Sequence, residues 1–482
     1  MQCLPGCLVV REVEDTQLQL DLLLVVPPGK SHYVVPPIGL GYLATALRKA
    51  GFDNVAILDS IKESLDVPRL TDRIKSLAPR IVGFQVFSTD FSSVRACSAI
   101  IKKILPDSLI IVGGPHVSAR GADSLSDFPN ADYGFQGEAE IGLPLFARRI
   151  LEGEDIPFEK IPGLIYHDGV GLKAADRVLV EDLDSLGFPA WDLMPPSSYP
   201  DAPQGAFYKN FPIAPIATSR GCPYTCAFCG SPVNMGNRLR FRSLGSVLAE
   251  MEFLYEQYGV REFHFIDDMF NASKKRVIEF CRKLGGKDWA ISYTFPNGLR
   301  LNTLDEESLS WLKRTGAYAF TVGIESGSQR ILDSMNKKLT LEMIRDKVGL
   351  IAKAGIEPSG FFLIGFPGET KEDMKKTLAF AKSLPLKRAH FSNFLPLPGT
   401  EATRKLIESG EITEPKWEEL SYSRTPYSPV GITKDELKAF QRRAFLEFHL
   451  RPKILFRMIL EINSLFHLKS IALRARDYLS AS

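Results

Sequence analysis

Residues 219–230 read SRGCPYTCAFCG and place three cysteines, Cys222, Cys226 and Cys229, within eight positions. They directly follow Ile213–Ser219, an apolar run that predicts a β-strand, so the cysteines lie on a loop that leaves the carboxyl end of that strand. The chain has only seven cysteines among its 482 residues. The close spacing therefore indicates a metal site rather than a disulfide framework.

Iron–sulfur clusters usually take four thiolates, so three cysteines on one loop leave one iron open unless a fourth cysteine arrives from elsewhere. Cys97 and Cys281 lie within helical patterns and are predicted to be core residues, whereas Cys3 and Cys7 near the N-terminus receive no role. A zinc knuckle is the alternative. Zinc modules usually pair two ligands with two more downstream, and no second pair follows here.

A series of six βα units begins at the strand before the cysteine loop. Helical patterns separate the strands, near residues 243–257, 273–284, 305–314, 341–354 and 371–382. The predicted strands are Ile213–Ser219, Glu262–Asp267, Ile291–Pro296, Ala319–Glu325, Gly360–Gly365 and His390–Leu395. This order predicts a partial (β/α)6 barrel over residues 205–400, with its chemistry at the carboxyl ends of the strands.

Residues 1–150 show an earlier alternation of short β-branched runs and helical patterns. The predicted strands are Leu20–Val26, Val55–Leu58, Ile81–Val86 and Leu109–Val112. This order predicts a doubly wound, Rossmann-like parallel sheet as the first domain of an α/β protein. Such sheets bind ligands at the carboxyl ends of their strands. The loops there are 36–41 (PPIGLG), 87–90 (FSTD), 113–116 (GGPH) and 134–138 (GFQGE).

Two regions lack the βα pattern. Residues 151–204 contain many Pro, Asp, Gly and Ser residues and are predicted to be a linker. Residues 401–482 are predicted to be mainly helical, with basic residues between apolar ones at helical spacing. We interpret this tail as a helical cap on the barrel, with a membrane-surface or partner helix as the alternative.

Composition gives the broad class. The 59 Lys and Arg residues nearly balance the 57 Asp and Glu residues, so charge does not favour nucleic acid as a partner. The N-terminus lacks a basic stretch before a long apolar run, and no apolar run reaches the ~20 residues that a membrane-spanning helix needs. Together with the few cysteines, these features predict a soluble, cytoplasmic protein.

The cysteine motif resembles the signature of radical S-adenosylmethionine (SAM) enzymes, including the aromatic Phe228 before the last cysteine. Four later segments are similar to the strand-end motifs of that family and occur in the same order. They are REFHFIDDMF at 261–270, NGLR at 297–300, GIESG at 323–327 and GFPGET at 365–370. The resemblance covers the whole predicted barrel.

This resemblance implies that Cys222, Cys226 and Cys229 bind a four-iron four-sulfur (4Fe-4S) cluster whose open iron chelates the amino and carboxylate groups of SAM. An electron from the cluster then cleaves the sulfonium and releases a 5′-deoxyadenosyl radical, so the cofactor supplies the difficult chemistry. An external one-electron reductant of the flavodoxin or ferredoxin type is implied as a partner. The residues expected to contact SAM are Phe228, Asp267, Asp268, Arg300 and Glu325.

The first domain resembles the cobalamin-binding domain of cobalamin-dependent radical enzymes, through PPIGLGYL at 36–43, VGGPH at 112–116 and GEAE at 137–140. The Asp-x-His-x-x-Gly motif that supplies a lower axial histidine in many cobalamin proteins is absent, which implies cobalamin without a protein histidine beneath cobalt. For His116, a turn-capping role is the alternative to a cofactor contact. The residues expected at the cobalamin site are Pro37, Gly39, Gly41, Ser88, Thr89, Gly113, Gly114, His116, Gly137 and Glu138.

With both cofactors, the resemblance implies an enzyme that modifies an unactivated carbon of a small molecule or lipid, most often by methyl transfer. An oxidative cyclase, as in chlorophyll synthesis, or a rearrangement enzyme stays open. A methylthiotransferase is disfavoured because Cys3, Cys7 and Cys97 do not form a recognisable second triad. A non-catalytic iron–sulfur or zinc interaction protein is disfavoured because a scaffold needs no strand-end carboxylates such as Asp267 and Glu325.

Overall fold

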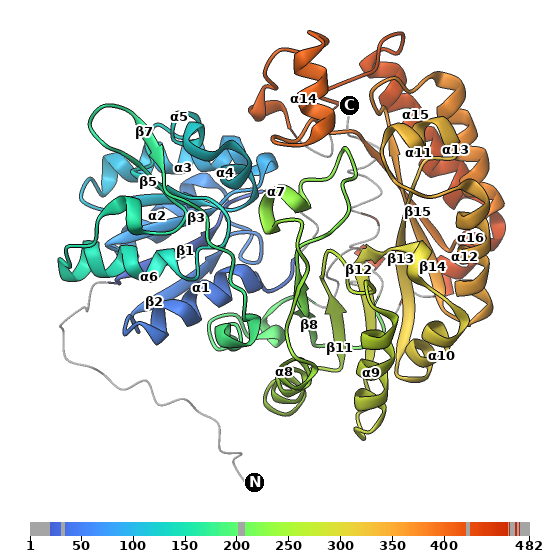
Figure 1. Ribbon diagram of the computed structural model, residues 1–482, viewed down its shortest axis with the longest axis horizontal. Helices are drawn as coiled ribbons and strands as arrows, with labels where there is room; N and C mark the ends of the chain where they lie inside the picture. The colour runs from blue at the N-terminus through green and yellow to red at the C-terminus, as the bar shows by residue number, and fades with distance from the viewer. Residues whose placement is uncertain are drawn as a thin grey trace.

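The structure, a computed structural model, describes residues 20–29, 34–200, 208–420 and 425–460, together with residues 462, 468, 469 and 472. Two large β-sheets lie side by side, each covered by helices (Figure 1). This arrangement confirms the predicted α/β fold class. Cys3 and Cys7 lie outside the described residues.

The first sheet has seven strands in the order β2-β1-β3-β4-β5-β6-β7. Its parallel strands are β1 (Leu22–Val26), β2 (Val55–Asp59), β3 (Ile81–Gln85), β4 (Leu109–Gly113) and β5 (Tyr133–Phe135). Its helices are α1 (Ile38–Lys49), α2 (Val67–Leu77), α3 (Phe91–Ile104), α4 (Pro115–Arg120), α5 (Ser124–Asp127) and α6 (Gly142–Ala147).

Both faces of this sheet are buried. In β1, Leu23 and Val25 pack with residues of α2 and α3, whereas Leu22 and Leu24 pack with residues of α1 and α6. Because helices cover both faces, the strands are continuous apolar runs, which is why the sequence predicts them well. Cys97 of α3 is fully buried in the first of these cores, and burial raises the pKa of its thiol to about 12. This confirms its prediction as a core residue.

Residues 151–204, which were predicted to be a linker, contain two short strands and several buried side chains. Residues 164–174 contain the antiparallel strands β6 (Leu164–His167) and β7 (Leu172–Ala174), which extend the first sheet. Further on, Trp191 and Met194 are buried in the core of the second sheet, and the Trp191 indole donates a hydrogen bond to Glu250 at 3.0 Å. Very short strands and single buried side chains leave no periodic signal, so the sequence does not reveal them.

The second sheet is parallel, in the order β15-β14-β13-β12-β11-β8. Its strands are β8 (Ile213–Ile216), β11 (Glu262–Phe265), β12 (Ser292–Leu299), β13 (Ala317–Glu325), β14 (Glu357–Ile364) and β15 (Arg388–Asn393). Its helices are α8 (Leu244–Gln257), α9 (Lys274–Gly285), α10 (Glu306–Arg314), α11 (Gln329–Ser334), α12 (Leu341–Lys353), α13 (Lys371–Ser383) and α14 (Glu401–Glu408). The six strands confirm the predicted βα series, and the curved sheet is visible in Figure 1.

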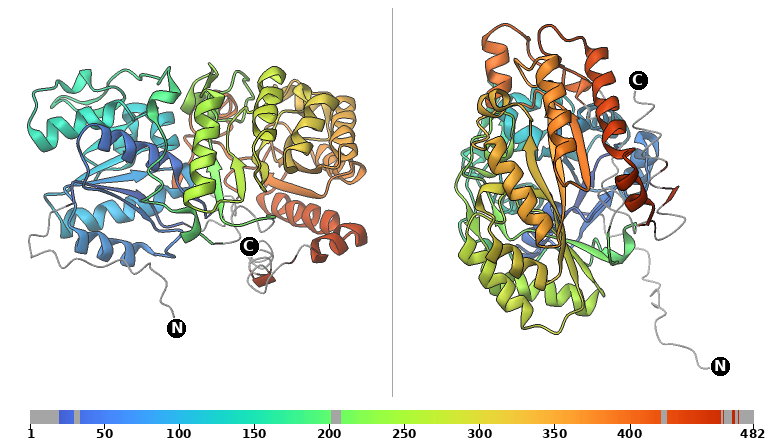
Figure 2. Two further views of the ribbon diagram at one scale, coloured as in Figure 1. Left: turned by 90° about the horizontal axis from the view of Figure 1, so that it is seen from below. Right: turned by 90° about the vertical axis from the view of Figure 1, so that its right-hand side faces the viewer.

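Two helices follow the second sheet. α15 (Lys434–His449) packs against β15 (Figure 2). Its Ala444 and Phe448 join the core of the sheet. α16 (Pro452–Leu460) exposes Leu455, Phe456 and Ile459. Within the described part of the chain, no helix has the length and apolar character to cross a membrane.

The buried His449 at the end of α15 makes stability depend on pH. Burial lowers the pKa of its imidazole to about 4, and the charges of Arg388 and Arg451 act in the same direction, against a hydrogen bond to the Phe445 carbonyl. His390 lies close enough to interact with it electrostatically. In the unfolded chain a histidine binds its proton near pH 6.5. Stability is therefore expected to fall as the pH drops from about 6.5 to about 4.

Urea unfolding tests this expectation. Between pH 7.5 and pH 5.0, linkage predicts a loss of about 2 kcal/mol that depends on His449. His449→Gln is expected to lose correspondingly less over the same interval. Equal losses for the two proteins would contradict the assigned pKa.

Candidate functional site

The cysteine loop leaves the second sheet between two short antiparallel strands, β9 (Ser219–Arg220) and β10 (Arg240–Phe241). Gly221 has a φ of +92°, and a Cβ added there would lie 2.4 Å from the Arg238 carbonyl oxygen. The Cys222 N–H donates to the Gly236 carbonyl at 3.3 Å, and the Cys229 N–H donates to the Cys226 carbonyl at 3.1 Å. The positive φ and the nearby Arg238 carbonyl therefore require glycine at position 221, where the loop turns out of the strand.

The three cysteines are partly exposed and lie close enough to influence one another. Burial raises the pKa of the Cys229 thiol to about 11, and the charges of Cys226, Asp268 and Cys222 act in the same direction. Neighbouring thiolates therefore need a positively charged centre to stay ionised, and a metal supplies one. The donor set fits an iron–sulfur cluster.

The spacing of the cysteines also bears on the zinc alternative. Among residues that the structure describes, no three His, Cys, Asp or Glu side chains converge so as to hold a single metal ion. In a four-iron cluster each thiolate binds a different iron, whereas the ligands of zinc surround one ion. Three cysteines on one short loop can bind three irons of such a cluster, whereas a zinc knuckle uses a second ligand pair that does not follow in the sequence.

The segment after α11 holds the cysteine loop in place. The Ala227 N–H donates to the Met335 carbonyl at 2.9 Å, and the Asn336 side-chain amide donates to the Thr225 carbonyl at 2.9 Å. On the other side, the Ala402 N–H of α14 donates to the Ala227 carbonyl at 2.8 Å. The loop is thus fixed to elements that are far from it in sequence.

An ion pair lies beside this loop, at the carboxyl end of β13. Lys337 Nζ is 2.6 Å from Glu325 Oε1 and 5.7 Å from the centre of the Phe228 ring. Burial alone lowers the pKa of Lys337, but the charges of Glu325 and then Cys226 raise it. Glu325 and Phe228 were expected at the site from the sequence, whereas Lys337 was not, because no motif marks this lysine.

Arg300 joins the same group. Its Nη2 donates to the Lys337 carbonyl at 2.7 Å, and its guanidinium carbon lies 3.4 Å from the centre of the Tyr224 ring. The cysteine loop is therefore bordered by two positively charged side chains, Lys337 and Arg300, which suit a ligand that carries a carboxylate.

The two aspartates after β11 have different positions. Asp267 is buried and accepts hydrogen bonds from the Thr218 N–H at 3.0 Å, the Thr218 hydroxyl at 2.8 Å and the Ser219 hydroxyl at 2.5 Å. It joins the ends of β8 and β11, so its carboxylate is already occupied by the protein. Asp268 is exposed and acts electrostatically on Cys222 and Cys229. Of the two, only Asp268 presents an accessible carboxylate beside the cysteines.

The residues expected at the cobalamin site lie at or beside the carboxyl ends of the parallel strands of the first sheet. Gly39 is exposed, and Pro37, Thr89, Gly113 and Gly114 are half-buried, so this edge keeps accessible surface. Phe87, which follows β3, is 47% exposed at the same edge. Phe87 is not among the residues expected at the site, although an aromatic residue directly after a predicted buried strand is a signal that the sequence offers.

Two of the glycines serve the protein's own packing. A Cβ at the buried Gly41 would lie 2.2 Å from Met194 Cε and 2.8 Å from Pro189 Cβ. The space beside Gly41 is therefore filled by side chains of residues 151–204. Gly114 has a φ of +105°, and a Cβ there would lie 3.0 Å from the Val86 nitrogen. Glycine is needed at both positions for close contacts within the chain.

His116 is a core residue rather than an open ligand contact. Its side chain is 0% exposed, its Nδ1 is 3.0 Å from the hydroxyl of the buried Ser88, and its Nε2 is 3.5 Å from Asp127. The rings of Phe128 and Trp417 pack edge-on against it. Neither side chain has a free face at the edge of the sheet, so this geometry supports a structural role for the His116 ring.

Gly137 and Glu138 directly follow Gln136, just after β5. Gly137 has a φ of +76°, and its N–H donates to the Ser118 hydroxyl at 2.8 Å. Glu138 is 5% exposed and binds Arg240 through both carboxylate oxygens, at 2.7 and 2.8 Å. Glu138 was expected at the cobalamin site, and in the structure its carboxylate forms an ion pair with Arg240 of β10.

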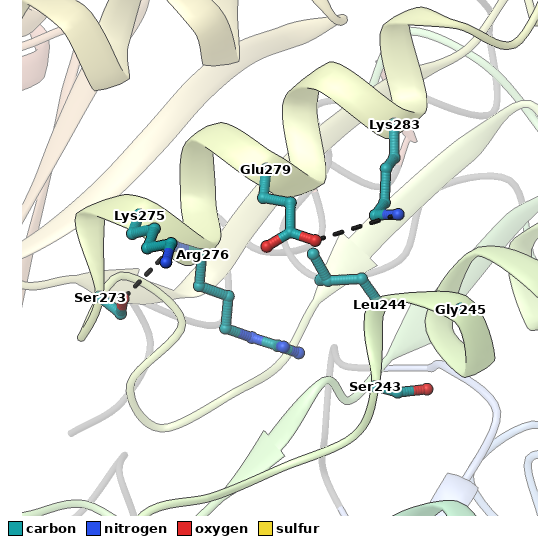
Figure 3. A pocket seen from close by; sticks show the side chains of 8 residues that line it. All are labelled: Ser243, Leu244, Gly245, Ser273, Lys275, Arg276, Glu279 and Lys283. Atoms are coloured by element: carbon teal, nitrogen blue, oxygen red, sulfur yellow. Dashed lines mark hydrogen bonds and ion pairs between the residues drawn. The ribbon is translucent and has the colours of Figure 1, made fainter.

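A separate cavity of 410 Å³ lies between α8 and α9 (Figure 3). It is lined by Ser243, Leu244, Gly245, Ser273, Lys275, Arg276, Glu279 and Lys283. Arg276 is held by the Arg242 carbonyl at 2.7 Å and packs on the Phe241 ring. The cavity contains none of the cysteines or strand-end carboxylates, so it is distinct from the candidate site.

Replacing Lys337 by methionine is expected to destabilise the cluster-free protein by about 3 kcal/mol, because it leaves the buried Glu325 carboxylate without its partner. Urea unfolding measures this loss. The control is Lys405→Met, which removes an exposed pair with Glu401 and should cost no more than about 0.5 kcal/mol. Similar losses for both variants would show that the Glu325 pair is not a stabilising buried pair.

Comparison with known proteins agrees with this geometry. The sequence model of the Radical SAM superfamily matches residues 216–381, and that of the B12 binding domain matches residues 26–147. An uncharacterized methyltransferase of Pyrococcus horikoshii is 30% identical over 96% of this chain and 99% of its own length. The anaerobic magnesium-protoporphyrin IX monomethyl ester cyclase of Rubrivivax gelatinosus is 26% identical over 86% of this chain and 75% of its own.

A solved structure shows the same architecture with cofactors bound. The radical SAM methyltransferase TsrM from Kitasatospora setae, with cobalamin and a [4Fe-4S] cluster, superimposes with a TM-score of 0.65 and 26% identity. The alignment covers 80% of this chain and 75% of TsrM. The chain therefore belongs to the radical SAM superfamily, among the members that carry an N-terminal B12-binding domain.

Proposed function

We propose that this radical SAM enzyme uses its 4Fe-4S cluster, SAM and cobalamin to transfer a methyl group to an unactivated carbon of a small molecule. The observation that carries the proposal is the direct contact between the cysteine loop region and the carboxyl edge of the B12-binding sheet, where Arg220 of β9 binds Glu140 at 2.6 Å. A reaction in which both cofactors act on one substrate requires such proximity, because reacting groups must be held close together and oriented.

The chain's own residues would then bind and orient the cofactors. Cys222, Cys226 and Cys229 would hold the cluster. Lys337 and Arg300 would place positive charge beside the carboxylate of SAM, and the Glu325 carboxylate, held by Lys337, would accept hydrogen bonds from its amino or ribose groups. When bound, the cluster supplies the electron that cleaves SAM, and cobalamin supplies the methyl carrier.

An oxidative cyclase is the second candidate, because a cyclase of Rubrivivax gelatinosus aligns with most of this chain. Trideuteriomethyl-labelled SAM separates the two reactions. The reconstituted enzyme is incubated anaerobically with a reductant and a small-molecule extract of cells that carry the gene, and products are identified by mass spectrometry. A product that gains the labelled methyl group supports methyl transfer. A product that loses hydrogen or gains oxygen without the label supports the cyclase.

The proposal includes three further features of the enzyme's setting. The electron would come from an external one-electron donor of the flavodoxin or ferredoxin type, which fits a cytoplasmic enzyme.

α16 would contact a membrane surface, since it exposes Leu455, Phe456 and Ile459 and carries Arg457. Flotation with anionic liposomes tests this contact. The full chain should float and the double variant Phe456→Asp/Ile459→Asp should not, whereas equal flotation would reject the contact.

A further inference from the structure

The cysteine loop begins and ends at a pair of arginines that face each other. Arg220 precedes Cys222 by two residues, and Arg240 follows the loop on β10. The two residues are direct partners in the antiparallel pair of β9 and β10. Whatever holds these two arginines therefore holds both ends of the segment that carries Cys222, Cys226 and Cys229.

Both guanidinium groups bind one carboxylate of the B12-binding domain. Glu138 accepts two hydrogen bonds from Arg240, at 2.7 and 2.8 Å, and lies 3.2 Å from Arg220 Nη1. Glu140 binds the second side of Arg220, with 2.6 Å between Nη2 and Oε1. We call Glu138, Glu140, Arg220 and Arg240 the charge clamp. It contains two positive and two negative groups, so its charges balance.

The charge clamp is buried. The side chains of Glu138 and Arg240 are 2% and 3% exposed, and those of Glu140 and Arg220 are 6% and 12% exposed. Burial alone raises the pKa of Glu138, but Arg240 and Arg220 lower it below its ordinary value. The pKa of Arg220 is raised by Glu140 and Glu138, against the effect of burial. Glu138 therefore stays charged, and a buried charged network has few alternative geometries that satisfy it.

Other contacts fix the clamp to Val180 of the linker region and to α1. Glu138 Oε2 accepts a hydrogen bond from the Val180 N–H at 2.7 Å, and Arg240 donates to the Val180 carbonyl at 2.7 Å. The Arg220 guanidinium lies 5.3 Å from the centre of the Tyr42 ring of α1. α7 (Ser231–Met235), the helix within the cysteine loop, also packs against α4 (Figure 1).

The charge clamp joins the edge of the B12-binding sheet to the cysteine loop. Glu138 and Glu140 follow β5, at the carboxyl edge where the first sheet keeps accessible surface near Gly39 and Phe87. The arginines flank the loop that holds the cluster. We propose that Glu138 and Glu140 are positioning residues, which set the separation between the cluster and cobalamin without touching either. This inference rests on the proposed use of both cofactors.

Electron paramagnetic resonance measures this separation without a substrate. Reduced cluster and cob(II)alamin are both paramagnetic, and the cluster accelerates the spin relaxation of cobalt in a steeply distance-dependent way. The measurement compares the microwave power that half-saturates the cob(II)alamin signal in wild type, Glu138→Gln and Glu140→Gln. Both variants are expected to keep cluster and cobalamin and to show a several-fold shift in this power. Glu140→Asp, which keeps the charge, is expected to lie closer to wild type.

Asp192→Asn is the matched control, because it removes an exposed ion pair between Asp192 and Arg48 of α1, 2.9 Å apart, that does not touch the cysteine loop. It should relax as wild type does. If Glu138→Gln does not fold, Glu140→Gln decides the question, since it leaves the Glu138–Arg240 pair intact. Unchanged relaxation in a variant that holds both cofactors would overturn the proposal.

Two other outcomes are distinguishable. Loss of cobalamin from a variant that keeps its cluster would also overturn the proposal, because it would make the glutamate a cobalamin ligand instead. A wild-type protein that shows no cob(II)alamin signal would refute the proposed function itself, before any variant is compared.

Discussion

Cys226→Ala is expected to abolish reductive cleavage of SAM, with 5′-deoxyadenosine falling below detection in an anaerobic single-turnover assay. Cys226 lies at the centre of the loop, and its thiol interacts electrostatically with both other cysteines and with Lys337. Two thiolates cannot hold a cluster that depends on three. Iron content and the charge-transfer absorption of the cluster should be lost together with activity.

Cys281→Ala is the matched control for this experiment. Cys281 is fully buried in α9, its sulfur lies 3.9 Å from the Tyr293 hydroxyl, and it was predicted to be a core residue. Its replacement should cost a modest amount of stability and leave the cluster intact. If Cys226→Ala still produced 5′-deoxyadenosine at the rate of the control, the cluster assignment would be wrong.

Gly221→Ala is the second change with a large expected effect. The added Cβ would lie 2.4 Å from the Arg238 carbonyl oxygen, in a backbone conformation with a φ of +92° that alanine rarely adopts. Because the neighbour is backbone rather than a flexible side chain, the loop must move. We expect the variant to retain at most about a tenth of the wild-type cluster after reconstitution, in line with a strain of more than about 1.4 kcal/mol at the site.

Gly153→Ala separates backbone strain from steric contact. Gly153 has a φ of +77°, but a Cβ there would meet no atom within 4 Å. This control carries a similar conformational cost without the collision, and its iron content should equal that of wild type. If both variants reconstitute fully, the close approach at Gly221 is not what shapes the cysteine loop.

The long periodic elements were predictable because their burial is repeated along the chain. The strand predicted at Ala319–Glu325 occurs as β13, Ala317–Glu325, and the helix predicted near 371–382 occurs as α13, Lys371–Ser383. The hairpin of β6 and β7 was not predictable, since strands of four and three residues are too short for a pattern. Local sequence therefore predicts long helices and buried strands better than short strands at the edge of a sheet.

The candidate site was predictable where a motif combines unusual residues at fixed spacing, as in the three cysteines. It was less predictable where a side chain's partner is distant in sequence. Lys337 reaches Glu325 from the segment after α11, and Glu138 pairs with Arg240 across 102 positions. Asp267 and His116 occupy strand ends as expected, but hydrogen bonds to Thr218 and Ser88 give them roles within the protein. A motif locates such residues without revealing which way they face.

The most direct test of the central claim measures both cofactors in one sample. The wild-type chain is reconstituted anaerobically with iron, sulfide and cobalamin and separated by gel filtration. Iron, cobalamin absorption and SAM-dependent 5′-deoxyadenosine are then quantified in the protein fraction. The account predicts that cluster and cobalamin co-elute in equimolar amounts and that SAM is cleaved. A protein that binds its cluster but leaves cobalamin in the small-molecule fractions would contradict it.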